Sequence, residues 1–283
     1  AIGYNTMTSN TTGCQNTAVG TQALYSSSTG NNNIAIGISA LYSNTTGHNN
    51  VSIGCVALGA NTEGVSNVAI GYRTLDANTT ADCIVAIGAF ALTSNTTGPN
   101  NTAVGTEALG DNTTGSGNAA LGNYALSCNT DGYNNTGLGN AALLKNTTGD
   151  MNTAVGHDAL ACNTTASGNT AVGQDAMRIN TTGTANVAVG CGALICNTTG
   201  SNHTAVGRNS LGDNTTSSSN SAFGGNSLAS NTTGNFNTAL GYDALLLNTT
   251  ASQNTAVGTD SLRVSTTGTE NTAVGRSSLA VTT

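Results

Sequence analysis

His157 and Asp158 form the one point in the sequence where a histidine adjoins a carboxylate. A hydrolytic centre built on this pair would need a nucleophile from a distant segment. The other histidines, His48 and His203, lie far away in the chain. A Walker A loop, an HExxH motif and a CxxC motif are all missing from the sequence. We therefore expect no enzyme activity, no catalytic residues and a solvated His157.

Two pairs of aspartates recur at an interval of 17 residues: Asp158 with Asp175, and Asp243 with Asp260. If the chain returns to the same place at that interval, each pair is adjacent and could share a weak cation. Mutually repelling carboxylates in solvent are the favoured alternative. The calcium-binding nonapeptide repeat is also missing, so we predict no metal site and no cofactor.

Three cysteines, Cys128, Cys162 and Cys196, recur at twice that interval. Two strand spacings would separate neighbours by about 9 to 10 Å, which is too far for a disulfide. The remaining cysteines, Cys14, Cys55, Cys83 and Cys191, are scattered. We predict small residues in tolerant positions rather than a disulfide framework.

The 17-residue interval is the main feature of the sequence, because an internal repeat constrains the fold more strongly than any single motif does. We call the remainder of a residue number divided by 17 its slot. Slot 3 is glycine in every copy, without insertion or deletion, and we predict that it forms a structural corner where φ is positive. These glycines are Gly3, Gly20, Gly37, Gly54, Gly71, Gly88, Gly105, Gly122, Gly139, Gly156, Gly173, Gly190, Gly207, Gly224, Gly241, Gly258 and Gly275.

The other slots complete the unit N-T-A-V-G-x-x-A-L-x-x-N-T-T-G-x-x. Slot 7 is Leu or Met, slot 2 is Val, Ile, Leu or Phe, and slot 16 is Asn except at Ile84 and His203. The unit is too short for a helical hairpin repeat of about 33 to 47 residues, and its glycines and Asn-Thr-Thr segments disfavour helix. We predict an all-β parallel β-solenoid with one coil per repeat and about 16 to 17 coils, in which one extra residue would break the register.

Charge is confined to particular slots. The chain has only 7% charged residues, against about 25% in ordinary domains, and all six basic and thirteen acidic side chains occupy slots 4, 5, 8, 9, 12, 14 and 15. The remaining slots therefore mark the interior or a contact. The net charge of −7 disfavours nucleic acid as a partner, and no apolar run is long enough to span a membrane.

Strand alternation suggests where slots 1 and 2 point. We expect slots 2 and 7 to point inward from two facing sheets. Slot 1, which is only Ala, Ser or Gly, would then form a flat outward stripe covered laterally by another solenoid. A narrow interior that admits alanine through a backbone twist is the alternative. Because so little apolar volume is available, backbone ladders, stacked asparagines at slots 10 and 16, and many coils in series must supply the stability.

Twelve slot-10 asparagines fit the N-x-[ST] pattern of possible glycosylation: Asn10, Asn44, Asn78, Asn95, Asn112, Asn146, Asn163, Asn180, Asn197, Asn214, Asn231 and Asn248. The alternative is an inward or corner asparagine ladder, because Asn61 and Asn129 keep the asparagine without the downstream threonine. Threonine dominates slots 11 and 12, and one outward threonine row would suit ice binding, although Glu63 and Asp131 interrupt slot 12.

The segments NTAVGTEAL (residues 101–109) and NVAIGYRTL (residues 67–75) resemble the YadA-like head repeats of trimeric autotransporter adhesins. The full unit also resembles tandem repeats of bacterial and phage tail-fibre-like proteins. The adhesin resemblance implies left-handed coils, assembly as trimers and binding to host matrix. The 17-residue period and the added NTTG segment depart from that family's pattern.

We therefore predict a structural repeat protein, with residues 1–283 as one continuous array that forms an extracellular or surface-exposed fibre, stalk or adhesin shaft. Its expected partner is itself, by lateral packing, as a trimer or by end-to-end stacking. Because no atypical capping coil occurs, we also expect that the array is a window of a longer fibre or polymerises end to end. The alternative is a solenoid that binds ice, carbohydrate or host matrix, with glycans as possible partners.

Overall fold

The computed structural model describes residues 1–281 and divides the chain into two compact units, Ala1–Ala141 and Ala142–Thr283. Each unit contains eight three-residue strands and no helix among its described residues. The first unit holds β1 (Thr17–Val19), β2 (Ile34–Ile36), β3 (Val51–Ile53), β4 (Val68–Ile70), β5 (Val85–Ile87), β6 (Thr102–Val104), β7 (Ala119–Leu121) and β8 (Thr136–Leu138). The second holds β9 (Thr153–Val155), β10 (Thr170–Val172), β11 (Val187–Val189), β12 (Thr204–Val206), β13 (Ser221–Phe223), β14 (Thr238–Leu240), β15 (Thr255–Val257) and β16 (Thr272–Val274).

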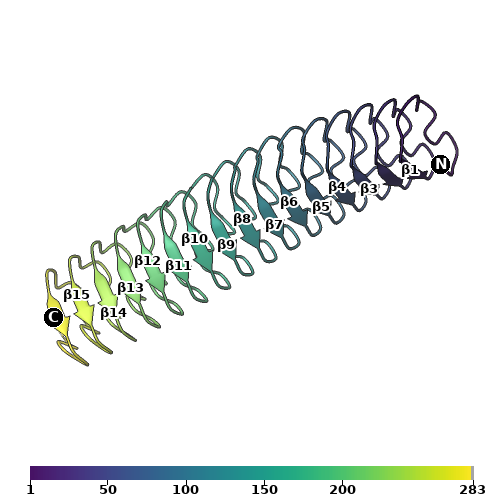
Figure 1. Ribbon diagram of the computed structural model, residues 1–283. Coiled ribbons are helices and arrows are strands. Elements are labelled where there is room, and N and C mark those ends of the chain that lie inside the picture. The colour runs from purple at the N-terminus through teal and green to yellow at the C-terminus, as the bar shows by residue number, and fades with distance from the viewer. Residues whose placement is uncertain (282–283) are drawn as a thin grey trace. The chain divides into compact units, whose positions relative to one another are not determined.

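Within each unit the strands pair in sequence order as a parallel sheet (Figure 1). The register joins equal slots of successive repeats: Ala18 lies opposite Ala35 in the first unit, and Ala171 lies opposite Ala188 in the second. One 17-residue repeat is therefore one turn. The prediction of an all-β parallel solenoid is confirmed, while its left-handedness stays a prediction.

Backbone hydrogen bonds between coils continue outside the strands. The N–H of Leu24 donates to the carbonyl oxygen of Ala40 at 3.0 Å, and the N–H of Ser26 donates to that of Tyr42 at 3.0 Å. Because the bonds run all round the turn, short strands are enough to hold neighbouring coils in register.

The slot-3 corner requires glycine for two reasons, both visible at Gly156. Its φ of 139° is disfavoured for residues with a Cβ. A Cβ built on it would also lie 2.5 Å from the carbonyl oxygen of Gly173 in the next coil. The other slot-3 glycines have φ between 123° and 142°.

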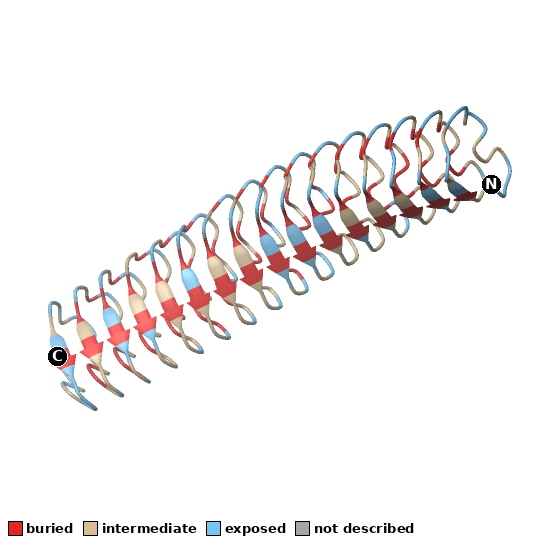
Figure 2. Cartoon of the chain, viewed as in Figure 1, coloured by how far each residue is buried: buried red, intermediate tan, exposed pale blue. Residues whose placement is uncertain are grey.

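The predicted orientation of the slot-1 and slot-2 side chains is wrong. Slot 1 points inward, with Ala18 at 1% exposure and Ala35 at 0%, whereas Ile36 in slot 2 is 38% exposed. Figure 2 shows a buried residue recurring at the same point of every strand. The interior is so narrow that alanine from the strand already fills the space beside the slot-7 leucine, and a larger slot-2 side chain is left outside. The small-residue stripe is therefore not an outward surface.

The prediction of two facing sheets is also wrong, because each unit has one sheet, and the segment opposite that sheet is a series of turns. Slots 5, 7 and 15 adopt positive φ in coil after coil; Leu24, for example, has a φ of 51°. The left-handed conformation disfavours bulky residues by about 1 to 2 kcal/mol. Leu24 nevertheless keeps its side chain at 0% exposure, so packing and inter-coil bonds hold it there.

Two asparagine ladders line the interior. In slot 16, Asn33 donates from Nδ2 to the carbonyl oxygen of Gly47 at 2.9 Å, and its Oδ1 accepts the N–H of Asn50 at 3.0 Å. In slot 10, Asn61 donates from Nδ2 to Asn44 Oδ1 at 2.9 Å and to the carbonyl oxygen of Gly64 at 3.1 Å. These amides replace part of the apolar core, because a buried polar group is tolerated when its hydrogen bonds are made.

Candidate functional site

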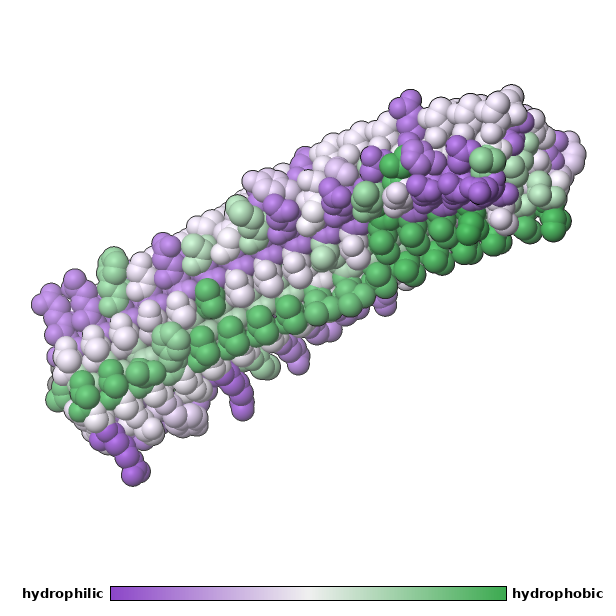
Figure 3. All heavy atoms as spheres, in the orientation of Figure 1, coloured by the Kyte–Doolittle hydropathy of each residue, from purple (hydrophilic) through white to green (hydrophobic). Residues whose placement is uncertain are grey.

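The candidate site is the outward face of each sheet, which we define as the first and third side chains of every strand. These side chains belong to slots 0 and 2, and none of them is charged. Examples of the third residue are Ile36 at 38% exposure, Leu138 at 41%, Phe223 at 40% and Leu240 at 49%. Figure 3 shows hydrophobic side chains gathered in a ridge over the strands. An uncharged apolar row that solvent reaches is typical of a contact surface.

The outward face of the first unit is hollowed at β7. A depression of about 260 Å³ lies over Ala119, between Thr102 and Thr136, with Leu121 and Leu138 along one side. It forms because alanine takes the slot-0 place that larger residues take in the two neighbouring strands. A side chain from a partner could enter this hollow.

The twelve asparagines proposed for glycosylation face the interior. Eleven are 0% exposed, and Asn10 is half-buried. Asn112 is representative: its Nδ2 donates to Asn95 Oδ1 at 2.8 Å and to the carbonyl oxygen of Gly115 at 2.9 Å. A glycan bond to Nδ2 requires that atom at the surface, so the burial of these side chains disfavours glycosylation of the folded coils, and glycosylation stays a prediction.

The threonines of slots 11 and 12 separate into two roles. The slot-11 threonines hydrogen-bond to the next coil: Thr181 donates from Oγ1 to the carbonyl oxygen of Thr198 at 3.0 Å. Slot 12 is exposed in every coil that the structure describes. Where Asp131 interrupts slot 12, Thr114 and Thr113 donate to its Oδ1 at 2.6 and 3.1 Å, and these hydrogen bonds lower the pKa of Asp131.

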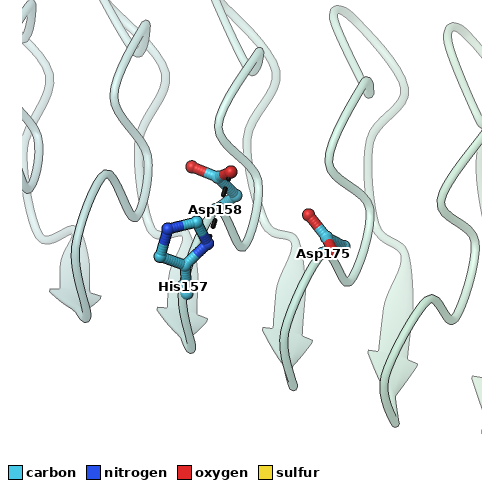
Figure 4. A group of neighbouring side chains, drawn as sticks. All are labelled: His157, Asp158 and Asp175. Atoms are coloured by element: carbon cyan, nitrogen blue, oxygen red, sulfur yellow. Dashed lines mark ion pairs between the residues drawn. The ribbon is translucent and has the colours of Figure 1, made fainter.

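The structure brings His157, Asp158 and Asp175 together (Figure 4). Nδ1 of His157 lies 3.3 Å from Asp158 Oδ2, and one potential ligand atom from each of the three lies within 4.8 Å of the others. The cluster is open to solvent, with 58% of the His157 side chain exposed, and Arg178 Nε lies 3.9 Å from Asp175 Oδ1. The arginine supplies the positive charge that a cation would bring.

The second carboxylate pair is bridged by an arginine. Arg263 Nε lies 3.7 Å from Asp243 Oδ2 and 3.4 Å from Asp260 Oδ1. The pair therefore neither repels freely nor needs a cation, an outcome that neither of our two interpretations included.

Most of the cysteines are free thiols, some exposed and some half-buried: Cys14, Cys55, Cys83, Cys162, Cys191 and Cys196. Burial, with the charge of Asp213 as a smaller cause, raises the pKa of the Cys196 thiol. A raised pKa leaves less of the reactive thiolate at neutral pH.

His203 is the histidine that the fold buries, at 1% exposure. It takes the place of a slot-16 asparagine, and its Nε2 lies 2.7 Å from the carbonyl oxygen of Ser217. Burial lowers the pKa of His203, and its hydrogen bond to the carbonyl oxygen of Ser217 opposes that shift only in part. His203 thus continues the slot-16 ladder.

Slot 14 carries a third ladder that sequence reasoning missed. The N–H of Cys14 donates to Asn31 Oδ1 at 2.8 Å, and the N–H of Ser201 donates to Ser218 Oγ at 3.2 Å. Short side chains with an acceptor oxygen recur in this slot, among them Asn31, Asp82, Ser167, Ser201, Ser218, Asn235 and Ser252. That recurrence was the signal.

Residues 1–281 contain no helix of the length and apolarity that crossing a bilayer requires. No protein-family model matches the chain. A search of curated proteins likewise gives no significant match.

Proposed function

We propose that the protein is a structural solenoid that packs on further copies of itself through the outward face, as part of an extracellular or surface-exposed fibre, stalk or shaft. The observation that carries this proposal is the contrast between exposure and charge. Slots 0 and 2 reach solvent but are never charged, whereas all nineteen charged residues of the chain lie in slots 4, 5, 8, 9, 12, 14 and 15, some of which are less exposed than slot 0. If charged residues occurred at random among the exposed positions, some would fall in slots 0 and 2 of the sixteen strands.

A second copy of this chain is the occupant that fits the outward face best. Its rows repeat at the strand spacing of about 4.8 Å, and another copy has the same spacing, so side chains can interdigitate along the whole face. Eight strands of three residues offer roughly 400 Å² in each unit, by strand dimensions of about 4.8 Å and 3.3 Å. One such face is about half of the roughly 800 Å² that each partner contributes to a standard stable interface.

The resemblance to adhesin head repeats and tail-fibre-like repeats supports a location outside the cell or on a virion. We propose no enzymatic role, because the polar groups that the fold brings together are ladder asparagines and arginine-paired carboxylates. Protease treatment of intact cells or particles from the source would test the location: surface exposure predicts cleavage of the protein without lysis.

Sedimentation equilibrium of the 27.8 kDa chain tests self-association. We expect species of two or more chains at micromolar concentration. The variant with Val172→Lys and Val189→Lys places charges on the outward face and should sediment as a monomer, because lysine is disfavoured in an apolar contact. The matched control, Thr182→Lys with Thr199→Lys, adds the same charges to the exposed slot-12 row and should associate as the wild type does. A wild type that stays monomeric at all concentrations would contradict the proposal.

Ice binding through slot 12 is the second candidate, because its threonines are exposed in every described coil and form an uninterrupted row in the second unit, from Thr148 to Thr267. Growth of single ice crystals in the presence of the protein tests it. Faceted crystals that become round with Thr199→Lys would favour this candidate, and unshaped crystals would remove it.

A further inference from the structure

Slot 8 contains a row of side chains that stops abruptly in the first unit. Tyr25 and Tyr42 occupy this slot in successive coils, and their rings stack with centroids 5.1 Å apart and planes inclined by 3°. The next coil has Gly59 there and the coil after it has Asp76. One face of the Tyr42 ring is therefore covered by Tyr25, and the other is turned toward a position without a side chain.

The missing side chain leaves a notch. A hollow of about 380 Å³ lies over Gly59, with Tyr42 at one end, Asp76 at the other, and Ser39 and Ser43 on its walls. This volume falls within the range of about 300 to 1,000 Å³ that small-molecule sites occupy. Between Tyr42 and Asp76 the backbone advances two strand spacings, about 9.6 Å, which is room for one ring between them.

Asp76 directs an oxygen into the notch. Arg73 donates from Nε and Nη2 to Asp76 Oδ2, at 3.0 and 2.9 Å, and so holds the carboxylate in place. The other oxygen overhangs the glycine: a Cβ built on Gly59 would lie 3.0 Å from Asp76 Oδ1. The notch thus has an aromatic face at one end and a fixed hydrogen-bond acceptor at the other.

We propose that this notch, formed by Tyr42, Gly59 and Asp76, binds a single pyranose ring of a carbohydrate. The C–H face of the sugar lies on the open face of Tyr42, where the ring continues the aromatic stack. A sugar hydroxyl donates a hydrogen bond to Asp76 Oδ1, and the hydroxyls of Ser39 and Ser43 hydrogen-bond to other oxygens of the sugar. A sugar fits better than a planar aromatic molecule because a carboxylate and two hydroxyls offer more hydrogen-bonding groups than an aromatic ring can satisfy.

The site is independent of self-association, since slots 5, 8 and 9 form it and slots 0 and 2 form the outward face. The chain also carries an internal comparison at Gly110, another slot-8 glycine. A hollow of about 210 Å³ lies there, and its slot-8 neighbours are Thr93 and Ser127, so it has no tyrosine in slot 8 at its end, and the one aromatic residue that lines it is Phe90 in slot 5. The same gap without a tyrosine should not hold a sugar.

Saturation-transfer NMR of the full chain with methyl glycosides of glucose, galactose, mannose and N-acetylglucosamine tests the proposal, with phenol as the aromatic probe. We expect at least one glycoside to bind with a dissociation constant on the order of millimolar, since a ligand of this size gains little free energy per atom. Gly59→Tyr fills the notch; the chain accepts tyrosine in slot 8 at Tyr25 and Tyr42, and at Gly59 the new Cβ, 3.0 Å from Val56 Cγ1 and from Asp76 Oδ1, requires these two side chains to shift. This variant should reduce the transfer at least tenfold, whereas Gly110→Tyr should leave it unchanged.

Circular dichroism of both variants verifies that the coils are intact. Tyr42→Ala should also abolish glycoside binding, and Asp76→Asn should weaken it severalfold and change the preference among the glycosides. Three outcomes would overturn the proposal: no glycoside binds, binding persists in Gly59→Tyr, or phenol alone binds. Because none of these variants touches the outward face, their results are separable from those of the sedimentation experiment.

Discussion

The ring of His203 accepts the backbone N–H of Asn220 at its Nδ1, with a distance of 3.2 Å. In other coils the Oδ1 of a slot-16 asparagine accepts this bond, as Asn186 Oδ1 accepts the N–H of His203 itself at 2.9 Å. Since a backbone N–H can only donate, Nδ1 carries no proton, and the neutral ring keeps its proton on Nε2, where it donates to Ser217. A histidine can therefore replace an asparagine in the ladder only while it is neutral.

This arrangement predicts acid sensitivity. The pKa of His203 is lowered in the folded chain, whereas in the unfolded chain it is about 6.5. The free energy of unfolding is therefore unaffected above pH 6.5 and decreases as the pH falls from 6.5 toward the folded pKa, because the unfolded chain takes up the proton first. The maximum slope from one such group is about 1.4 kcal/mol per pH unit.

Urea unfolding between pH 7.5 and pH 5 measures this slope. His203→Asn restores the usual ladder residue and should flatten the profile, while His48→Asn, at an exposed position in a slot that already accepts asparagine at Asn31, should leave it as in the wild type. Equal slopes for the wild type and His203→Asn would show that the neutral ring is not the source.

The slot-10 ladder predicts a strong asymmetry between two substitutions at Asn112. Asn112→Asp removes the Nδ2 donor and buries a carboxylate beside Asn95 Oδ1, which should destabilise the chain by about 3 kcal/mol or more at pH 7. Asn112→Ser should be milder, because the chain itself has Ser27 and Ser265 in this slot. Thermal unfolding measures both; similar losses for the two would contradict a continuous amide ladder.

The corner geometry predicts unequal effects of alanine at two glycines. Gly156→Ala meets both the φ of 139° and the carbonyl oxygen of Gly173, and should lower the free energy of unfolding by about 3 kcal/mol or more. Gly168 has a φ of 72° with nothing within 4 Å of its built Cβ, so Gly168→Ala should cost about 1 kcal/mol. Denaturant titration compares them, and a larger loss at Gly168 would refute the close approach of the corners.

Within residues 1–281, Val56 is the one β-branched residue among the non-glycine residues with positive φ, with a value of 58°. Branched residues are the least suited to this conformation, whereas asparagine tolerates it. Val56→Asn should therefore stabilise the chain by about 0.5 to 1 kcal/mol despite some lost apolar burial. A lower melting temperature for this variant would mean that side-chain packing, rather than backbone conformation, determines which residue is most stable in slot 5.

The sequence predicts the coil because equal residues at an unbroken interval must occupy equal environments. Gly156 and Asn112 could be placed at a corner and in a ladder for this reason. The direction of Ala18 and Ile36 could not be predicted, because alternation fixes only that neighbours oppose each other and not which of them faces the interior. The positive φ of Leu24 was hidden as well, since leucine is not a residue that ordinarily signals this conformation.

Of the candidate sites, the charge-free slots identified the outward face only as an interior or a contact, and exposure was needed to separate the two. The arginine bridge at Arg263 and the Tyr42 notch depend on side chains that differ from coil to coil. A consensus of the repeats does not contain such variable residues, and the structure is needed to show which of them are neighbours in successive coils.

The central claim, that each 17-residue repeat is one interchangeable coil, is tested most directly by comparing two deletions by circular dichroism and thermal unfolding. Removal of residues 171–187 takes out one whole coil and keeps every slot in register, so the spectrum and cooperative unfolding should persist with a melting temperature within a few degrees of the wild type. Removal of residues 171–186 shifts every later side chain by one position and should abolish cooperative unfolding of the second unit. Equal behaviour of the two deletions would contradict the account.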